Sequence, residues 1–492
     1  MKALFRKKWF RRSCQILVAV ISLIFLLVAA LNWFGARMKR EIVDRMRAEG
    51  RPTSIVEMLE PLPPDVENFA MIPVLAEARD RYWFANSAGD VGKSDPAAAK
   101  LMALGAPSLA GDRGFGDGKN PDLSHWKEAL QLAGNDAECL STYDLQHRDV
   151  LTQLRAGLSR AKAVSPLLRR MAAEDEIAGY RFGFPGCLLD LARGLRFRAE
   201  LALAAQQAEI GLESLLIYLR LAELIPSEAG LIMGQAYQNT LIYAIHPTLA
   251  RALASGNWSR DQIESLKSAL ANLNALRGNL RDLDCYNVWT LGRYQRIKDH
   301  PAERRNVWML NDRLKHYPRP MWVRNGLAKV DSILTMALPD GWFDFNAALD
   351  VKDGLDLRQA LGAGDHFRAW IAACEAAEAR AAAGSTWDLF RFPREVGCRW
   401  PPILKHEIHA QTLLLLARLA CDLEGDRLDR GSYPERLDEL KHSDIVDQLS
   451  GELFRYRRTE AGYLLYSVGA DGKDSGGKRN DKHRLGADDW VW

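Results

Sequence analysis

A cluster of acidic residues and glycines near the end of the sequence has residue types that can bind a cation. The run is DGKDSGGKRNDKHRLGADD, and its carboxylates are Asp471, Asp474, Asp481, Asp488 and Asp489. Calcium takes about six to eight oxygen ligands from carboxylates and carbonyls, and glycine lets a short loop present both. The run does not fit an EF-hand, because its third position is Lys473 and the later glutamate is absent. Composition alone favours a solvated turn region and leaves a calcium loop as the other interpretation.

A second candidate for metal chemistry is the stretch KHEIHAQ, from Lys405 to Gln411. His406 and His409 stand three residues apart and can share a helix face as metal ligands, with Glu407 beside them. A zinc peptidase helix carries H-E-x-x-H instead, and this spacing is one residue short. The pattern favours ordinary histidines near the start of a helix and keeps a metal-dependent hydrolase as an alternative.

Two other groups of side chains are candidates for ligand binding. One is polar and either lines a cleft or forms a charged solvent face: Asp282, Asp284, Asp299, His300 and Glu303. The other is aromatic and is more typical of a core than of a ligand platform: Trp322, Trp342, Phe343 and Phe345. The sequence has no G-x-S-x-G elbow, no P-loop and no dinucleotide-binding glycine motif, so it carries no common nucleophile or nucleotide signature.

The strongest signal for a structural element is an uncharged apolar run, QILVAVISLIFLLVAALNWF, from Gln15 to Phe34. It matches the roughly 20 residues that a helix needs to cross the hydrocarbon core of a bilayer. Six of the nine Lys and Arg residues among the first forty lie before it, and Trp9, Trp33 and Phe34 sit where interfacial aromatics usually anchor a helix. This pattern predicts a cytoplasmic N-terminus and an exported, periplasmic body on a single inner-membrane span. A cleaved signal peptide ending near Ala30 is the alternative.

The net charge of +3 is local, because the first forty residues carry nine basic residues and no acidic ones. Of the 66 Lys and Arg and 63 Asp and Glu residues in the whole chain, 57 basic and 63 acidic ones remain beyond that point. A body with this balance lacks the basic surface that nucleic-acid binding needs, and we expect no nucleic-acid partner. The seven cysteines contain no C-x-x-C pair, and small buried thiols are favoured over disulfides among the six beyond the span.

Apolar periodicity predicts a mainly α protein with five parts. These are a basic tail (1–14), a transmembrane helix (15–34), membrane-proximal helices with a glycine-rich loop (35–122), a multi-helix body (123–402) and a small α+β module (403–492). We expect a helix to continue out of the membrane over 38–60, and paired helices at 188–203 and 210–221. Ser259 and Gln262 form a capping box that starts another helix, and Pro226 and Pro247 are predicted to break helices.

The C-terminal module is predicted to combine one long helix, over 403–427, with a β-hairpin. Its strands are LFRYRR (453–458) and GYLLYSVG (462–469), which alternate in polarity around a short turn. The acidic and glycine-rich run follows the second strand directly.

The module, from about Leu404 to Trp492, resembles the C-terminal half of the type II secretion major pseudopilin. The residues that carry the resemblance are SYPE with Leu437 and Leu440, Ser450-Gly451, Arg455-Tyr456, Gly462-Tyr463, YSVGADG, Gly476-Gly477 and Asp488-Asp489. In that family the loop is a structural calcium site. The resemblance implies the Val468 carbonyl and the Asp471 carboxylate as ligands, with Asp488 or Asp489 closing the site. The chain departs from the family in two respects, because it has no prepilin processing signal and its helical body is foreign to pilins.

The whole chain also resembles a group of uncharacterised bacterial membrane-anchored helical proteins with the same order of parts. The resemblance is carried by PLPPDVENFA at 61–70, the paired helices LARGLRFRAELALA and GLESLLIYLRLAELI, LPDGWFDFN at 338–346 and the C-terminal module. It implies a common architecture and brings no activity with it. We therefore expect a non-catalytic scaffold or protein-interaction role at the cell envelope, with other envelope proteins as partners and a link to secretion or surface assembly. A ligand-binding or sensory ectodomain and a metal-dependent hydrolase are the two alternatives.

Overall fold

The computed structural model describes residues 2–59, 61–84, 103–104, 123–167, 169–170, 183–228, 233–276, 279–300, 304, 338–362, 367–383, 396–440, 445–460, 462–478 and 489–492. Within them the fold is mainly helical, with an apolar N-terminal helix and a small sheet region, as predicted. The helices are α1 (Lys2–Ala48), α2 (Pro73–Phe84), α5 (Leu123–Ala129), α6 (Asp136–Gln146), α7 (Arg148–Gly157), α9 (Gly183–Ala204), α10 (Ala208–Glu228), α11 (Met233–Ala254), α12 (Arg260–Asn272), α13 (Asn279–Asp299), α16 (Asp340–Gly362), α17 (Phe367–Ala383) and α18 (Val396–Arg430).

The chain divides into two compact units whose segments do not follow the order of the sequence. Unit 1 contains residues 1–58, 283–359 and 377–400, and unit 2 contains residues 59–282, 360–376 and 401–492. Unit 1 therefore joins the N-terminal helix to segments more than two hundred residues away. This arrangement brings α1 together with parts of α13 and α16.

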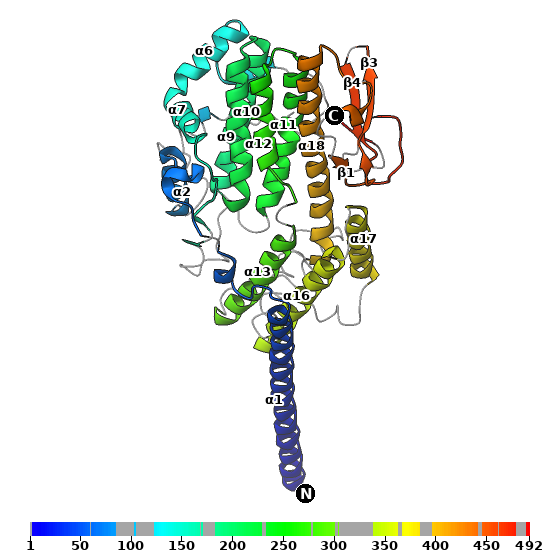
Figure 1. The fold of residues 1–492 in the computed structure, drawn as a ribbon. Helices are drawn as coiled ribbons and strands as arrows, with labels where there is room; N and C mark the ends of the chain where they lie inside the picture. Colours follow the sequence, from blue (N-terminus) through cyan, green and yellow to red (C-terminus); the bar gives the residue numbers. More distant parts are fainter. Residues whose placement is uncertain are drawn as a thin grey trace. The chain divides into compact units, whose positions relative to one another are not determined.

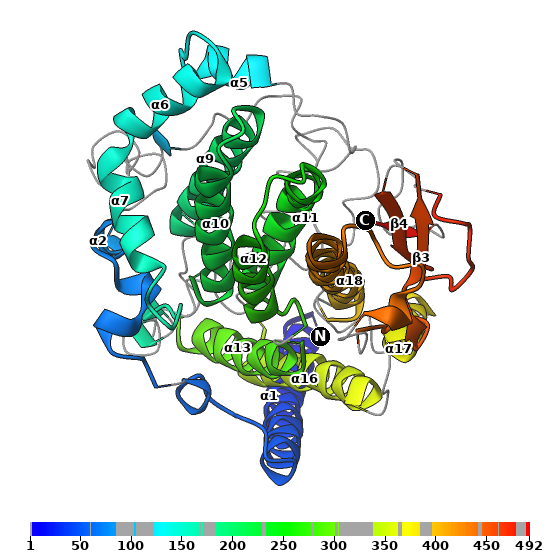
Figure 2. The same cartoon turned by 45° about the horizontal axis from the view of Figure 1, so that its top comes forward.

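The core of unit 2 is a set of helices that lie side by side, α9, α10, α11 and α12 (Figures 1 and 2). Leu188, Leu191 and Leu195 place one apolar stripe of α9 in this core, and all three are fully buried. Gln206, with φ at 57°, turns the chain between α9 and α10, so the predicted helix pair is present. The predicted capping box of Ser259 and Gln262 also starts α12, with both of its hydrogen bonds formed.

Two of the predicted helix breaks are wrong, because both prolines lie inside helices. Pro226 stands in the last turn of α10, which continues past it to Glu228. Pro247 lies within α11, between Ile245 and Leu249, which are both buried in the core of unit 2. Packing of this kind on either side of a proline outweighs the local loss of one hydrogen bond and keeps the helix continuous.

The small sheets of the C-terminal module confirm the predicted hairpin. Strands β3 (Arg455–Thr459) and β4 (Gly462–Ser467) pair antiparallel, and β5 (Trp490–Val491) adds to the other edge of β4. A separate pair consists of β1 (Val446–Asp447) and β2 (Glu452–Leu453). Phe454 and Leu465 join the core cluster that includes the apolar face of α18, so the hairpin is held on that helix (Figure 1).

Candidate functional site

Helix α1 is the one helix among the described residues that is long and apolar enough to cross a membrane, a property that a signal sequence shares. Most of its large apolar side chains between Ile16 and Phe34 are exposed, with Phe25 at 71%. Exposure of this kind over a whole helix circumference is typical of a segment surrounded by lipid. The helix does not end where the apolar run ends, because it continues without interruption to Ala48. The predicted continuation is therefore present, but the helix ends at Ala48 and does not reach residue 60. Just beyond its end, Gly50 adopts φ 65°.

Beyond the apolar run, one face of α1 packs against unit 1. Gly35, Ile42 and Met46 are buried at intervals of seven and four residues, which place them on one side of a helix. A Cβ atom on Gly35 would lie 1.9 Å from the carbonyl oxygen of Gly341, so the two backbones touch there. The Asn32 side-chain oxygen accepts a hydrogen bond of 2.7 Å from the Gly341 backbone N–H, in the first turn of α16.

Three ion pairs extend this contact along α1. Lys39 lies 3.2 Å from Asp344, and Arg45 lies 3.1 Å from Asp356; both carboxylates belong to α16. Together with the contacts of Asn32 and Gly35 described above, these contacts of Lys39 and Arg45 with α16 form what we call the α1 clamp. The Asp344 carboxylate is almost fully buried and also pairs with Lys298 at 2.7 Å. Two cations around one buried carboxylate offset its desolvation, which a single partner does less well.

The third pair joins Arg51, just beyond α1, to Asp284 of α13. Arg51 lies 4.0 Å from that carboxylate, and Arg358 lies at 2.9 Å on its other side. Burial raises the pKa of Asp284, and the two guanidinium groups oppose that rise. Sequence analysis grouped Asp284 with possible cleft residues, and the structure places it in this buried ion-pair network of unit 1.

In the C-terminal loop, the Asp489 carboxylate organises the backbone directly. It is 4% exposed and accepts hydrogen bonds from the Ser475 N–H at 3.0 Å and the Gly477 N–H at 2.7 Å. Gly476 and Gly477 both have φ at 76°, in the left-handed region that favours glycine. The glycines therefore turn two backbone donors towards one carboxylate, and this closes the loop on β5.

Asp474 holds the other side of the same loop. Its carboxylate accepts hydrogen bonds from the Tyr466 hydroxyl and the Gly476 N–H, both at 2.9 Å, and lies 3.3 Å from the Arg455 guanidinium. The Gly476 N–H and the Tyr466 hydroxyl lower the pKa of Asp474. The loop is thus tied to both strands of the hairpin through one exposed carboxylate.

Three of the four predicted calcium ligands lie in the described part of the chain, and Asp488 lies outside it. Val468 is buried at the end of β4, whereas the Asp471 side chain is exposed and accepts a hydrogen bond of 2.9 Å from the Lys473 N–H. Across the described ranges, no group of three or more His, Cys, Asp or Glu side chains is placed to hold a metal ion. The two described carboxylates, Asp471 and Asp489, already accept backbone N–H groups. The calcium site remains a prediction.

Asp447 is a residue of this module that sequence analysis missed. It is buried at the end of β1, and its carboxylate accepts hydrogen bonds from the Ser467 hydroxyl at 2.8 Å and the Leu449 N–H at 3.0 Å. Burial raises the pKa of Asp447, and these hydrogen bonds oppose the rise. The signal that could have found it is the D-x-x-S-G pattern of residues 447–451, which is typical of an Asp-stabilised turn.

The histidine pair occupies two different environments on α18. The His406 side chain is exposed, whereas Glu407 and His409 are buried. The Tyr243 hydroxyl donates a 2.6 Å hydrogen bond to the His406 carbonyl oxygen, and the Tyr243 ring lies 5.2 Å from the His409 ring. On its other side, His409 packs against Trp490 of β5 at 4.4 Å. His409 thus lies between aromatic rings of α11 and β5, and it helps to seat the C-terminal strand.

His246 of α11 makes the matching contact with Trp492, at 4.9 Å between ring centroids and nearly perpendicular. Trp490 and Trp492 therefore each pack against a histidine, from α18 and from α11. Edge-to-face contacts between rings of this kind add about 0.5 to 1.5 kcal/mol beyond the area that they bury.

The aromatic candidates are divided between the core and the edge of unit 1. Phe343 is fully buried with the Arg304 guanidinium 4.9 Å above its ring, an arrangement typical of a core cation–π contact. Trp342 and Phe345 are half-buried, and Trp322 lies outside the described residues. Of the polar group, Asp299 accepts a hydrogen bond from Gln295 and His300 is exposed, while Glu303 lies outside the described part.

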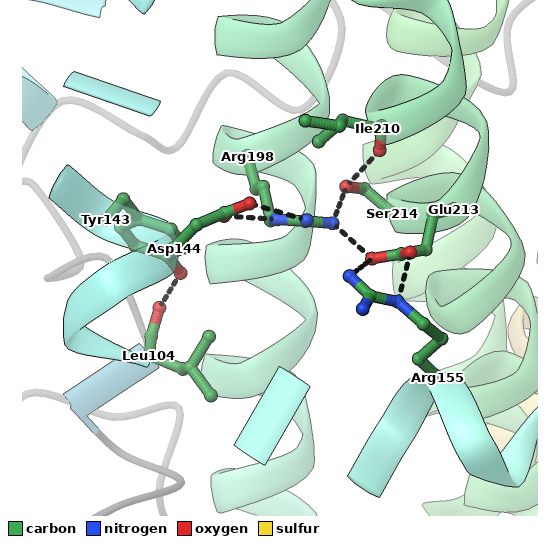
Figure 3. A network of polar contacts seen from close by, with 8 residues as sticks. All are labelled: Leu104, Tyr143, Asp144, Arg155, Arg198, Ile210, Glu213 and Ser214. Carbon is green, nitrogen blue, oxygen red and sulfur yellow. Dashed lines mark hydrogen bonds and ion pairs between the residues drawn. The ribbon is translucent and has the colours of Figure 1, made fainter. Parts of the chain in front are cut away.

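A polar network that joins four helices of unit 2 is centred on Arg198 of α9 (Figure 3). Its guanidinium is fully buried and makes two hydrogen bonds to Asp144, at 2.6 and 2.8 Å, and one each to Glu213 and Ser214. Arg155 pairs with Glu213 from the exposed side at 2.5 and 3.0 Å. Two cations and two carboxylates balance in charge, so the network joins α6, α7, α9 and α10 without a net buried charge.

The protonation state of this network follows from the same contacts. Burial alone would lower the pKa of the Arg198 guanidinium, but Asp144 and Glu213 raise it overall. Beside it, burial raises the pKa of Tyr143, whose hydroxyl donates a 2.7 Å hydrogen bond to the Leu104 carbonyl oxygen. Arg198 and Tyr143 are therefore in their ordinary protonated forms near neutral pH, and the network acts as a structural joint.

Comparison of the chain with protein-family models, with curated proteins and with solved structures finds no match.

Proposed function

We propose that the protein is a single-pass inner-membrane protein that carries its helical body on the periplasmic side and has a non-catalytic scaffold or protein-interaction role. One observation carries the proposal: α1 is a single helix that exposes an apolar surface over 16–34 and then packs into unit 1 over its second half. The alternative, a signal peptide ending near Ala30, would be cut in the middle of this helix, because α1 is continuous from Lys2 to Ala48. The continuity of α1 through residue 30 supports an anchor that is retained.

The clamp also favours a positioning role over a flexible tether. A tethered enzyme or sensor needs only a linker between its anchor and its body. Here Lys39 and Arg45 are ion-paired within unit 1, and Asn32 is hydrogen-bonded to it. These contacts restrict bending and rotation of the anchor relative to unit 1, which suits a protein that presents a surface to other envelope proteins.

Topology is tested with alkaline phosphatase and green fluorescent protein fused after residue 58 and at the C-terminus. Active phosphatase fusions together with non-fluorescent green fluorescent protein fusions support the periplasmic orientation, because the phosphatase folds only after export. Fluorescence of the fusions at both positions places the body in the cytoplasm and contradicts the periplasmic orientation. Loss of the first thirty residues from the mature chain, seen by mass spectrometry, contradicts a retained anchor.

The interaction role is tested by photo-crosslinking in native membranes. A photo-reactive amino acid replaces Val66 or Leu145, two of the most exposed apolar residues outside α1, at 78% and 66%. A scaffold gives discrete crosslinked products at one of these sites and not at the exposed Lys352 control. Absence of products at every exposed apolar site tested in this way argues against a scaffold.

The C-terminal module is proposed to hold a structural calcium ion through Val468, Asp471 and Asp488 or Asp489, with the pseudopilin resemblance as its support. Calcium supplies charge that would tie the acidic loop to the end of β4. The expected result is a rise in Tm with calcium relative to chelator, absent in Asp471→Ala and absent when magnesium replaces calcium. If the Tm of the parent protein is the same in calcium and in chelator, the proposed calcium site is wrong. The proposed membrane anchor does not depend on this result.

A further inference from the structure

The apolar part of α1 fixes a depth scale for the residues that contact it. Residues 16–34 rise by about 28 Å at 1.5 Å per residue. This length matches the roughly 30 Å hydrocarbon core of a bilayer. If Ile16 lies at one boundary of that core, then Trp33 and Phe34 lie at the other. Any part of unit 1 that touches Asn32, Phe34 or Gly35 is then at the depth of the outer boundary.

The first turn of α16 makes these contacts. The Gly341 backbone N–H donates to the Asn32 side chain at 2.7 Å, and the Gly341 backbone touches Gly35. One turn further on, the Phe345 ring lies 6.0 Å from the ring of Phe34. Three contacts of different kinds therefore place the same short segment beside the end of the apolar run.

The rest of α16 leads away from this level. Asp344 pairs with Lys39 and Asp356 pairs with Arg45, so positions later in α16 meet positions later in α1. Lys39 stands seven residues beyond Asn32, which corresponds to about 10 Å along the helix axis. The N-terminal end of α16 is consequently the end that lies closest to the membrane.

The side chains of this turn suit the boundary between hydrocarbon and headgroups. Trp342 and Phe345 are half-buried, and Asp340 is exposed and ion-paired with Arg304. On α1 at the same level, Trp33 is 60% exposed, and the Arg37 guanidinium lies 5.5 Å from its ring centroid. Tryptophan, phenylalanine and basic residues are typical of interfacial zones, where an apolar ring meets polar headgroups.

We propose that the N-terminal end of α16, Asp340–Phe345, lies in the interfacial region of the bilayer as a second membrane contact beside the anchor helix. This inference rests on the proposed membrane span. It assigns a lipid surface as the partner of Trp342 and Phe345, and it explains why the α1 clamp begins within the apolar run instead of beyond it.

The test is a depth measurement with nitroxide spin labels on the full chain in nanodiscs of phosphatidylethanolamine and phosphatidylglycerol. One cysteine at a time replaces Trp342 or Asp340 in a chain whose Cys14 and Cys398 are changed to serine. The five native cysteines that remain are buried, which protects them from the label. Asp340 is exposed and serves as the second site if Trp342→Cys fails to fold. Phe25→Cys is the control within the span, and Lys352→Cys, in the exposed part of α16, is the aqueous control. Collision rates with oxygen and with a water-soluble nickel chelate report the depth of each label.

The expected ratio of oxygen to nickel collisions at residues 342 and 340 is several-fold above that at 352 and below that at 25. A ratio at 342 and 340 equal to that at 352, with residue 25 deep in the bilayer, overturns the second contact and leaves the anchor standing. Equal aqueous ratios at all four positions, residue 25 included, overturn the membrane span itself and with it both proposals.

Discussion

The side-chain oxygen of Asn32 accepts a hydrogen bond from the backbone N–H of Gly341, across 309 residues of sequence. Asn32 is the one polar side chain in the second half of the apolar run, and Gly341 lies in the first turn of α16, where backbone N–H groups lack helical acceptors. A polar residue that interrupts the exposed apolar stretch is thereby given a partner. The two helices are joined at the point where the apolar run ends.

Replacement of Gly35 with alanine is expected to destabilise the protein. The added Cβ would lie 1.9 Å from the Gly341 carbonyl oxygen, so α1 and α16 must separate, at a cost of about 1 to 3 kcal/mol. Gly292→Ala in α13 is the matched control, because nothing lies within 4 Å of its added Cβ. That control is expected to stabilise by about 1 kcal/mol, since alanine is the better helix former. Thermal unfolding of the full chain in detergent compares them, and equal shifts would show that the α1 clamp is not closely packed.

Replacement of Arg198 with methionine is expected to cost about 3 kcal/mol or more, because it leaves the Asp144 and Glu213 carboxylates without their buried partner. Arg155→Met removes an exposed partner of the same Glu213 and is expected to cost no more than about 1 kcal/mol. Chemical denaturation of the two variants measures the difference. If Arg155→Met proved as damaging as Arg198→Met, the central position of Arg198 in the network would be refuted.

The two carboxylates Asp447 and Asp474 are expected to give opposite dependences of stability on pH. Burial raises the folded-state pKa of Asp447, so the folded state binds more protons than the unfolded state. Its contribution to stability is therefore lost as the pH rises from about 3.9, the ordinary value, through the folded value. The pKa of Asp474 is lowered, so its contribution is present above the ordinary value and is lost as the pH falls through the folded value.

Thermal melting between pH 3 and 7 of the parent, Asp447→Asn and Asp474→Asn proteins checks these signs. The Tm of Asp447→Asn relative to the parent is expected to rise with pH, and that of Asp474→Asn to fall. A constant difference for either variant across the range would contradict the corresponding pKa direction.

Asp489→Ala is expected to loosen the C-terminal loop even in the presence of chelator, because the Ser475 and Gly477 N–H groups lose their acceptor. Faster amide hydrogen exchange at Ser475 and Gly477 measures the effect. Lys473→Ala, in the same loop, changes an exposed side chain and serves as the control. If exchange at Gly477 is unchanged in Asp489→Ala, the carboxylate does not organise the loop.

Local patterns predicted the elements whose stability is local or regular. The leucines of α9 recur with helical spacing, Ser259 and Gln262 mark the start of α12, and the hairpin strands follow one another with a short turn. The apolar run that ends at Phe34 predicted the long apolar helix α1, because the length of the run alone distinguishes it. In each case the physical cause lies within about twenty residues of sequence.

Relationships between distant segments could not be predicted in this way. The approach of Gly35 to Gly341 and the pairing of Arg198 with Asp144 depend on which helices become neighbours, and no pattern in a single sequence reports that. Pro247 shows the same limit, since its breaking tendency is local while the packing that overrides it is tertiary. For the loop, the sequence drew attention to the carboxylates, but the backbone N–H groups from which Asp489 accepts hydrogen bonds could not be read from side-chain identities.

If α1 spans the membrane as proposed, its continuity has a further consequence for neighbouring helices in the plane of the membrane. Each residue of an α-helix turns the chain by about 100° around the helix axis. One residue inserted near position 30 would therefore rotate all side chains before the insertion by about 100° relative to unit 1. When another helix pairs with a given stripe of the span, the rotational register of α1 therefore sets the orientation of unit 1 about the membrane normal. The face of the span that pairs with a partner helix would thus decide which side of unit 1 faces that partner.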